Sequence, residues 1–462
     1  MSKKGSDKPK KVPQLLRGMK DILPEEQRFW DFIRQRIDGV AQTYGFSRID
    51  TPILEETSLF VRSIGQETDV VEKEMYSFLD KSNESVSLRP EGTAGVVRAY
   101  IEHGMLNRPQ PVKMFYTGPF FRYDRPQAGR YRQFYQFGFE VLGDGHPVID
   151  AQLMMLAYSL LSEIGLPVTL QVNSVGCPTC REAYKKALND YYRTRKNAIC
   201  EDCKRRLQKN PLRLLDCKVP DCKLLAQDAP QTVDYLCEAC HAHFVKVLEH
   251  LDGLEIPYVL NARLVRGLDY YTGTAFEIWP VAQDENAEPP NAICGGGRYD
   301  MLVKQLGGPP TPAIGFAGGM ERLVIEIKNR DINVGMPPPP DVFVAQLGDA
   351  ARKKALTLFE DLRRAGLKVA ESFSKDGIKP QMEMANKLGV KYALIIGQKE
   401  MLDGTILIRD MENGIQETVD FQKIISEIQK RLSKNNVKAT NHNHIEVERT
   451  PPPETDLTKL PI

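Results

Sequence analysis

Three arginines stand in short segments rich in glycine or aromatic residues, far apart along the chain. They are Arg122 in FRYDRP, Arg266 in LVRGLDYY and Arg322 in GGMER. A guanidinium is always charged and presents a planar fork that matches phosphate oxygens. Three of them together would hold a triphosphate, because phosphoryl and nucleotidyl transfer depend mainly on positioning and charge stabilisation. Taken singly, each is more often a surface ion-pair partner of little energetic value.

The segment 133–142 is a candidate surface for a small polar ligand. Its side chains alternate between two faces if it is a strand. Gln136, Gly138, Glu140 and Leu142 then share one face, while the phenylalanines of the other face pack on a core. An amide, a gap left by glycine and a carboxylate suit a small polar ligand, although an ordinary half-exposed strand has the same pattern.

A turn at Arg89-Pro90-Glu91-Gly92-Thr93 places a carboxylate beside a hydroxyl. Both groups accept hydrogen bonds, so this turn is a candidate site for an ammonium group. The alternative is the start of a helix, with Thr93 as its N-cap.

Cysteines concentrate in one region, where eight of the nine lie between residues 177 and 240. They are Cys177 with Cys180, Cys200 with Cys203, Cys217 with Cys222, and Cys237 with Cys240. Three of these pairs have the C-x-x-C spacing of zinc ligands, and eight thiolates would make two four-cysteine sites. The alternative is a set of free thiols on a helical insertion.

The composition excludes several classes of protein. The chain has 462 residues, 42% of them hydrophobic, and a net charge of +1. It has neither a P-loop nor the glycine fingerprint of dinucleotide-binding folds. No apolar run approaches the ~20 residues of a membrane span, and no apolar stretch follows the basic N-terminus as in a secretory signal. We expect a cytoplasmic protein with reduced thiols and no membrane association.

The hydrophobic pattern predicts the elements that would position these residues. Apolar residues at helical spacing predict helices from Pro24 to Tyr44 and from Ile149 to Ile164. The segments 112–121 and 133–142 are predicted to be strands of one hairpin, joined by a long basic loop at 122–132. We expect two domains. The first spans 13–335 and contains a cysteine-rich insertion at 177–250, and the second is a mixed α/β domain at 341–432, after the prolines of 336–340. A basic arm at 1–12 and a tail at 433–462 are expected to be disordered.

Together these segments resemble the ordered motifs of class II aminoacyl-tRNA synthetases. Tyr44–Pro52 resembles the first motif, which carries the dimer interface, Phe121–Glu140 the second and Gly315–Arg322 the third. LVRGLDYY at 264–271, GGGRYD at 295–300 and RGMKD at 17–21 resemble stretches peculiar to histidyl-tRNA synthetases. The resemblance covers about residues 13–432. It implies an α+β fold: an antiparallel sheet with flanking helices, a helical insertion, and a C-terminal anticodon-binding domain.

The resemblance also implies roles for individual residues. Arg122, Arg266 and Arg322 would be catalytic and would bind ATP, with Gly318 beside them. The residues expected to bind histidine are Glu91, Gly92, Thr93, Arg122, Gln136, Glu140, Arg266, Tyr270 and Tyr271. The three glycines 295–297 would let a ligand approach the backbone closely.

The implied activity is that of a histidine–tRNA ligase, with ATP and Mg²⁺, L-histidine and tRNA(His) as its reactants and partners, in a homodimer. The loop residues expected to contact tRNA are Arg125, Gln127, Arg130 and Arg132. Structural zinc would not take part in catalysis. The nearest alternative is a synthetase-like regulatory subunit of histidine biosynthesis, but such proteins usually lack the anticodon-binding domain and much of the third motif.

Overall fold

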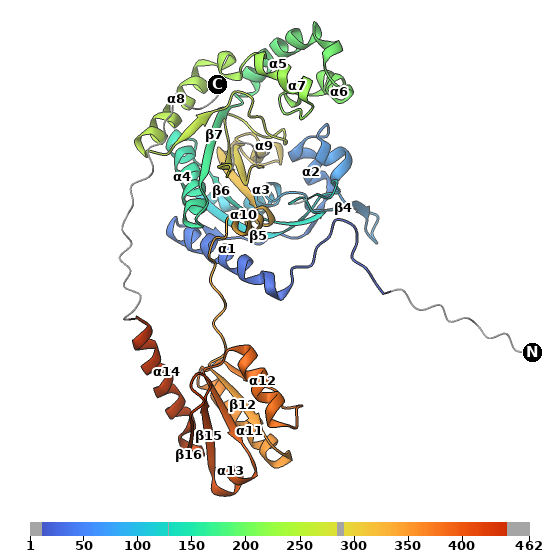
Figure 1. Ribbon diagram of the computed structural model, residues 1–462. Coiled ribbons are helices and arrows are strands. Elements are labelled where there is room, and N and C mark those ends of the chain that lie inside the picture. Colours follow the sequence, from blue (N-terminus) through green and yellow to red (C-terminus); the bar gives the residue numbers. More distant parts are fainter. Residues whose placement is uncertain (1–11, 128, 284–290, 441–462) are drawn as a thin grey trace, which may run out of the picture. The chain divides into compact units, whose positions relative to one another are not determined.

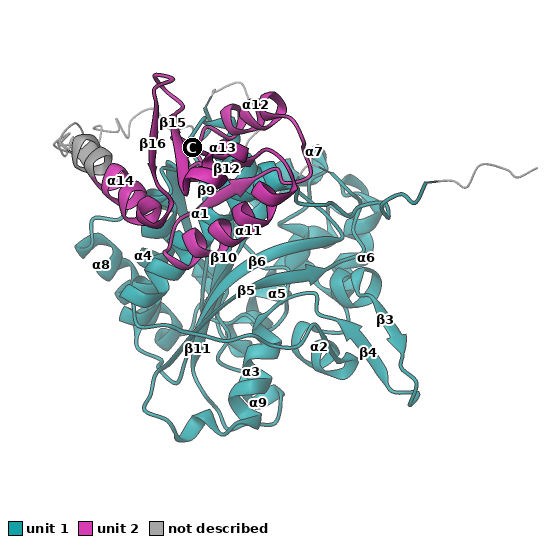
Figure 2. Cartoon of the chain, turned by 90° about the horizontal axis from the view of Figure 1, so that it is seen from below, with its two compact units in different colours: residues 1–335 teal, residues 336–462 magenta. Residues whose placement is uncertain are grey.

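The computed structural model describes residues 12–127, 129–283 and 291–440 (Figure 1). The chain divides into two compact units, Met1–Gly335 and Met336–Ile462, and the boundary falls where the run of prolines begins (Figure 2). The predicted arm at 1–12, apart from Val12, and the tail residues 441–462 lie outside the described residues.

Unit 1 is built on a mostly antiparallel sheet. Eight strands of the described residues form it, in the order β1-β5-β6-β11-β10-β9-β7-β8. Only the edge strands β1 and β8 run parallel to their neighbours. The strands are β1 (Ser47–Arg48), β5 (Val112–Phe121), β6 (Gln133–Leu142), β7 (Val168–Ser174), β8 (Tyr258–Leu260), β9 (Thr274–Pro280), β10 (Cys294–Arg298) and β11 (Ala313–Gly319).

The predicted hairpin is confirmed, since β5 and β6 pair antiparallel from Val112 opposite Leu142 to Phe121 opposite Gln133. On its other edge β6 pairs with β11. Strand β6 is therefore held on both sides, and the face on which each of its side chains lies is fixed by two sets of backbone hydrogen bonds.

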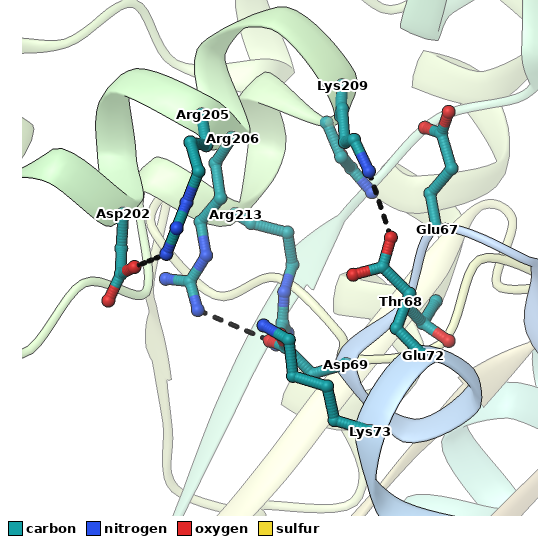
Figure 3. A pocket seen from close by; sticks show the side chains of 11 residues that line it. Glu67, Thr68, Asp69, Glu72, Lys73, Asp202, Arg205, Arg206, Lys209 and Arg213 are labelled. Atoms are coloured by element: carbon teal, nitrogen blue, oxygen red, sulfur yellow. Dashed lines mark hydrogen bonds and ion pairs between the residues drawn. The ribbon is translucent and has the colours of Figure 1, made fainter.

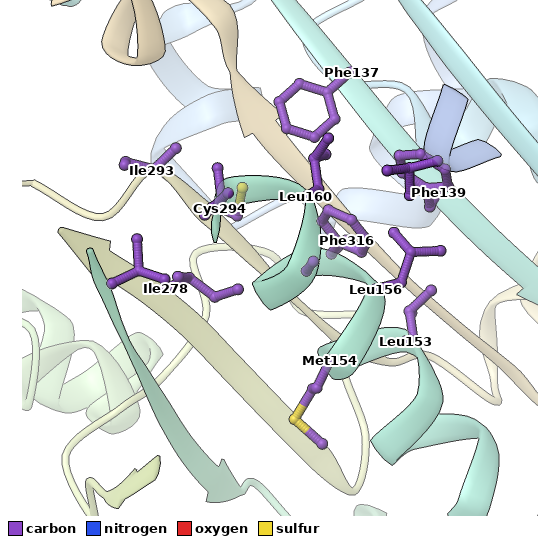
Figure 4. Close-up of a cluster of buried hydrophobic side chains, with 14 of the residues drawn as sticks. Phe137, Phe139, Leu153, Met154, Leu156, Leu160, Ile278, Ile293, Cys294 and Phe316 are labelled. Atoms are coloured by element: carbon purple, nitrogen blue, oxygen red, sulfur yellow. The ribbon is translucent and has the colours of Figure 1, made fainter. Parts of the chain in front are cut away.

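Helices α1 (Pro24–Thr43), α4 (Pro147–Glu163) and α10 (Met320–Asn329) cover one face of this sheet. Proline at the first position of α1 and two glutamates in its first turn suit a helix start. The core under these helices includes the side chains that β6 and β11 direct to this face, Phe137, Phe139 and Phe316, packed on leucines of α4 (Figure 4). The predicted burial of the phenylalanine face of β6 is thus confirmed.

The opposite face of the sheet carries a second apolar cluster with helices α3 (Thr93–Glu102) and α9 (Leu302–Gln305). Beside it lie helix α2 (Thr57–Ile64) and a three-stranded sheet of the described residues, in the order β2-β4-β3. These strands are β2 (Leu54–Glu56), β3 (Ser77–Leu79) and β4 (Ser85–Leu88). The second face is the one that carries Glu140 and Leu142.

The cysteine-rich region forms a helical insertion between β7 and β8. Its helices are α5 (Pro178–Arg193), α6 (Glu201–Lys209), α7 (Pro220–Leu225) and α8 (Glu238–Gly253). Tyr184, Leu188 and Tyr192 of α5 give it a small core of its own, and α8 returns to pack on α4.

Unit 2 is a compact α/β domain. Its described strands form one five-stranded sheet, in the order β13-β12-β14-β15-β16. The strands are β12 (Val342–Gln346), β13 (Val369–Glu371), β14 (Tyr392–Ile396), β15 (Thr405–Asp410) and β16 (Gln416–Asp420), and the helices are α11 (Asp349–Arg364), α12 (Ile378–Leu388), α13 (Gln398–Asp403) and α14 (Ile424–Thr440).

Two boundaries differ from the predictions. Helix α14 continues to Thr440, past the boundary expected at Ser433; this polar stretch has no proline or glycine to stop a helix. Helix α3 begins at Thr93, but Thr93 is not its N-cap. Instead, the carboxylate of Glu91 accepts hydrogen bonds from the backbone N–H groups of Thr93 and Ala94.

Among the described residues, no helix is both long and apolar enough to cross a bilayer.

Candidate active site

Small residues form a floor on the second face of the large sheet. The strand register aligns Gly295 of β10, Ala317 of β11 and Gly138 of β6 in one row across the sheet. A neighbouring row aligns Gly297 and Gly315 with Glu140. Because the glycines and Ala317 carry at most a methyl group, longer side chains such as those of Arg266 and Tyr116 lie directly over the strands.

Glu140 lies at the centre of this face and is almost fully enclosed, with 1% of its surface exposed. Its carboxyl accepts hydrogen bonds from the hydroxyls of Thr93 at 2.8 Å and Tyr299 at 2.5 Å, and the hydroxyl of Tyr116 lies 3.5 Å away. Burial raises the pKa of Glu140 to about 8, although the hydrogen bonds from Tyr299 and Thr93 oppose the shift. The protonated form of this carboxyl is therefore favoured to a higher pH than that of an ordinary glutamate.

Glu91 is the second buried carboxyl of the site. It holds the start of α3 through Thr93 and Ala94, at 2.7 and 2.8 Å, and the hydroxyl of Tyr270 lies 3.4 Å from it. Burial raises the pKa of Glu91, whereas the two backbone hydrogen bonds and the charge of Arg122 lower it in part. We call Glu91, Thr93, Tyr116, Glu140, Tyr270 and Tyr299 the acid–tyrosine cluster.

Arg266 lies over the glycine strand β10. A Cβ atom on Gly295 would stand 2.3 Å from its Nη1 atom, so only glycine leaves room for it there. Nη1 donates to Glu277 of β9 at 2.6 Å, and the guanidinium lies 5.2 Å from the ring centre of Tyr271. Burial by itself lowers the pKa of Arg266, but Tyr271 and Glu277 outweigh it and the pKa is raised. The buried Nε atom has no hydrogen-bond partner among the described residues.

Arg122 is the first residue of the hairpin loop, and Arg322 of α10 lies beside Gly129 of the same loop, whose Cβ position is 3.4 Å from the Cγ atom of Arg322. Nε of Arg122 donates to the carbonyl of Pro90 at 2.9 Å, next to Glu91. Arg322, near the start of α10, donates to the carbonyl of Ala292. Its pKa is lowered by burial first, and then by the charges of Arg130 and Arg122, which Glu277 opposes. The guanidinium of Arg322 is thus within electrostatic reach of Arg122 and of the carboxylate that binds Arg266.

The remaining predicted residues divide between the two faces. Gln136 is half-buried and lies opposite Gly319, the residue that precedes α10. Tyr271 packs on Tyr270 with ring centres 4.8 Å apart. Gly92 is buried against Tyr116, whose ring a Cβ atom would strike at 2.3 Å. Gly318, in contrast, faces Phe137 and Cys294 on the helix-covered side, so its lack of a side chain serves packing there.

The loop 122–132 differs in how firmly its residues are held. Arg130 forms an ion pair with Asp124 at 3.1 Å. Arg132 stacks on Tyr123, with its guanidinium 3.7 Å from the ring centre, and its backbone N–H donates to the carbonyl of Gly18. Arg125 and Gln127 have exposed side chains. Of the four residues predicted to contact nucleic acid, these two are therefore the most accessible.

The protein's matches to known families fit this geometry. Residues 18–323 match the family model described as "Histidyl-tRNA synthetase", and residues 341–431 match "Anticodon binding domain". The chain belongs to the histidyl-tRNA synthetase family. The large antiparallel sheet with its helices and the C-terminal α/β domain are accordingly the class II synthetase fold.

Relatives in this family match nearly end to end. A protein of Dehalococcoides mccartyi (strain ATCC BAA-2266 / KCTC 15142 / 195), named "Histidine--tRNA ligase", is 47% identical over 90% of this chain and 99% of its own length. A protein of the same name from Syntrophotalea carbinolica is 47% identical over 88% of this chain and 96% of its own length. The solved structure of the apo S. aureus histidyl-tRNA synthetase covers 90% of this chain and 100% of its own, with a TM-score of 0.75 and 37% identity.

Sequence reasoning missed three residues of this family member's site. Tyr116 and Tyr299 bind Glu140, and Glu277 binds Arg266. Each had a signal: Tyr299 lies inside GGGRYD, Tyr116 stands opposite Gly138 in the predicted hairpin, and Glu277 is the only charged residue of strand β9.

Two cavities of the described residues lie elsewhere in this synthetase fold. One, of about 280 Å³, lies between the segment 67–73 and the insertion and is lined by ion pairs such as Arg206 with Asp69 and Lys209 with Glu72 (Figure 3). The other, of about 360 Å³, follows β1 and the start of β5. Neither cavity contains a residue predicted to bind histidine or ATP.

Proposed function

We propose that this protein is a histidine–tRNA ligase, which uses ATP to activate L-histidine and transfers it to the 3′ end of tRNA(His). The observation that carries the proposal is that three arginines and the acid–tyrosine cluster share one face of one sheet, in a chain of this family. The arginines provide charge for a triphosphate, and the cluster provides hydrogen-bonding groups for a small amphoteric molecule.

Within this function, Arg122 binds the α-phosphate of ATP and the carboxylate of histidine, and Arg322 binds the γ-phosphate. Arg266 stabilises charge near the α-phosphate. Its pair with Glu277 and its stacking on Tyr271 hold the guanidinium in place before substrate arrives. Such preorganisation is what makes a charged donor effective in the transition state. ATP enters with Mg²⁺, which neutralises part of the triphosphate charge.

Histidine lies over the floor of small residues. Glu91 and Thr93, with Gln136, hold its ammonium group, while Glu140, Tyr270 and Tyr271 contact the imidazole. The raised pKa of Glu140 suits this task, because a carboxyl near its pKa either accepts from or donates to an imidazole nitrogen. A competing amino acid without an imidazole makes no hydrogen bond to Glu140, so it loses the contact by which the site selects histidine.

The chemistry takes two steps. An oxygen of the histidine carboxylate attacks the α-phosphorus, the bond to the β-phosphate oxygen breaks, and pyrophosphate leaves with that electron pair. The terminal ribose hydroxyl of the tRNA then attacks the acyl carbon of histidyl-adenylate, and AMP leaves. Holding both reactants in line replaces a bimolecular encounter by an intramolecular step.

The tRNA contacts unit 1 through the loop 122–132 and unit 2 through its α/β domain, residues 341–432. Arg125 and Gln127 are available for phosphates and base edges. Gly129 of the loop packs beside Arg322, since its Cβ position is 3.4 Å from Cγ of Arg322. Binding of tRNA at the loop therefore affects the ATP site.

The functional protein is a homodimer in the cytoplasm, where translation takes place. The dimer contact includes Tyr44–Pro52, which contains the edge strand β1 and borders the larger of the two cavities. Structural zinc bound by cysteines of the insertion belongs to the same proposal and takes part in neither chemical step.

One assay tests the function. Purified protein with histidine, ATP, Mg²⁺ and tRNA(His) should form histidyl-tRNA together with AMP and pyrophosphate, and omitting tRNA should leave histidine-dependent pyrophosphate exchange. Replacing histidine by another amino acid provides the control. A protein that folds but neither exchanges pyrophosphate nor charges tRNA would instead be the regulatory subunit. The relatives named as ligases over 90% of the chain favour the ligase.

A further inference from the structure

The eight cysteines of the insertion gather into two separate sets. Cys177, Cys180, Cys237 and Cys240 form the outer set, and Cys200, Cys203, Cys217 and Cys222 form the inner set. Within each set the four sulfur atoms lie within 4.8 Å of one another. In sequence, the inner set lies wholly inside the segment that the outer set closes.

The sulfur positions match a metal of tetrahedral geometry. Zinc–thiolate bonds of about 2.3 Å place sulfurs about 3.8 Å apart in a tetrahedron. The distances are 3.5 Å from Cys177 to Cys180, 4.0 Å from Cys177 to Cys237, and 3.9 Å from Cys200 to Cys217. All of them exceed a disulfide bond of about 2.05 Å.

Backbone geometry adds an independent indication of thiolate ligands. Cys177, Cys200 and Cys237 each precede the first residue of a helix, so N–H groups of three helix starts surround the sulfurs. The backbone N–H of Cys237 donates to the sulfur of Cys180 at 3.1 Å, and the backbone N–H of Cys200 donates to the sulfur of Cys222 at 3.2 Å. In each pair both residues belong to the same set. Such contacts stabilise negative sulfur and therefore a bound cation.

The outer set adjoins the segment that carries the tyrosines of the active site. Gly176, just before Cys177, accepts a hydrogen bond from the backbone N–H of Gly273 at 3.1 Å. Arg181, just after Cys180, donates to the carbonyl of Asp269 at 3.1 Å. Both ends of the segment 269–273, and with it Tyr270 and Tyr271, are thus attached to residues next to outer ligands.

The inner set is attached differently. Its helix α6 carries Arg206 and Lys209, which pair with Asp69 and Glu72 across the smaller cavity (Figure 3). It reaches the tyrosine segment through the Asn210 side chain, which donates to the exposed carboxylate of Asp269 at 3.1 Å.

We infer that each set binds one Zn²⁺ ion, and that the outer zinc, through Gly176 and Arg181, holds the histidine-binding segment 269–273 in position. This inference rests on the proposed function for the substrate and adds the grouping of the ligands and a positioning role for one metal. Cys177, Cys180, Cys237 and Cys240 are positioning residues in this sense, since they touch neither substrate.

The test compares full-length variants by zinc content and by pyrophosphate exchange. The wild type should contain two zinc ions per chain by elemental analysis. The pairs Cys237→Ser with Cys240→Ser, and Cys217→Ser with Cys222→Ser, should each lose one. Cys294→Ala, which changes the ninth cysteine in β10, should retain both. The outer variant should raise the KM for histidine about tenfold with a smaller change in kcat, and the inner variant should change that KM less than twofold.

Chelator treatment of the wild type, followed by addition of Zn²⁺, provides the second measurement if a variant is insoluble. Zinc loss should raise the histidine KM, and added zinc should restore it. A wild type with one zinc or less would overturn the two-site grouping, and an equal KM effect of the outer and inner variants would overturn the positioning role. A zinc-loaded protein without histidine-dependent exchange would contradict the proposed function and leave the metal sites intact.

Discussion

The carboxyl of Glu140 is mostly protonated at neutral pH in this structure, because its pKa of about 8 lies above the pH. The cause is burial, because the free-energy cost of removing a carboxylate from water exceeds the stabilisation by hydrogen bonds from hydroxyls alone. A ligand that brings a positive charge or an N–H group to Glu140 reverses part of this cost. In the proposed function, the proton state of this buried side chain is therefore linked to histidine binding.

Replacing Glu140 by glutamine should alter how stability depends on pH. The folded-state pKa, about 8, is above the unfolded value of 4.5, so the contribution of Glu140 to stability is complete below about pH 4.5 and is lost as the pH rises through 8. Relative to Glu140→Gln, the wild type should lose up to about 1.4 kcal/mol per pH unit between these values. Denaturant unfolding of both proteins from pH 5 to 8 measures this difference, and parallel profiles would contradict it.

Arg266→Ala should abolish adenylate formation while the fold survives. The guanidinium is held in advance by Glu277 and Tyr271, and removal of a preorganised charged donor costs about 10²- to 10³-fold in rate or more. Histidine-dependent pyrophosphate exchange measures the rate, and a circular dichroism melt checks the fold. Near-normal exchange would remove Arg266 from the mechanism.

At the scale of the element, the site depends on glycines placed in register on central strands. Gly315 of β11 lies opposite Glu140 of β6, and a Cβ atom there would stand 1.7 Å from the carboxyl oxygen. Such a contact is impossible without moving Glu140, whose three hydroxyl partners come from other elements. The strand pairing thus fixes both the position of the carboxyl and the residue type beneath it.

Gly315→Ala should therefore impair histidine binding and reduce stability. We expect a rise of at least tenfold in the KM for histidine and a melting temperature several degrees lower, since core overpacking costs about 1–3 kcal/mol. Gly39→Ala is the matched control, because Gly39 is exposed in α1 with nothing within 4 Å of its Cβ position. This control should be neutral or stabilising by about 0.5–1 kcal/mol. Equal melting temperatures for the two variants would refute the packing argument.

The sequence predicted strands more reliably than contacts. The alternation in 133–142 correctly predicted that Gln136 and Glu140 lie on the face opposite the phenylalanines, because period-two patterning follows directly from strand geometry. The hydroxyl of Tyr299 on Glu140 depends on a partner 159 residues away, which no local pattern reports. Gly318 likewise belongs to a glycine-rich motif, but only the pairing of β11 shows that it faces the core.

At the scale of the whole molecule, the two units contain different parts of the proposed reaction. All residues assigned to histidine and ATP lie in unit 1, Met1–Gly335, while the anticodon-binding match lies in unit 2. Each unit has its own core in the described residues. Activation of histidine and selection of tRNA should accordingly be separable.

A chain truncated after Gly335 should keep histidine-dependent pyrophosphate exchange within about tenfold of the full-length protein and lose most of its kcat/KM for tRNA(His). The reason is that the truncation removes tRNA contacts but no residue of the acid–tyrosine cluster. Parallel exchange and aminoacylation assays measure the two activities. Loss of exchange in a folded truncated protein would show that unit 2 is needed for activation.

The separation between Glu140 and Tyr299 has a consequence for synthesis on the ribosome. These 159 residues take about 10–30 s to translate at ordinary elongation rates. During that interval β5 and β6 emerge without β9, β10 or β11, and the edge of β6 that later pairs with β11 is unpaired. A growing chain with such an edge is a natural client for chaperones until the last strands of the sheet arrive.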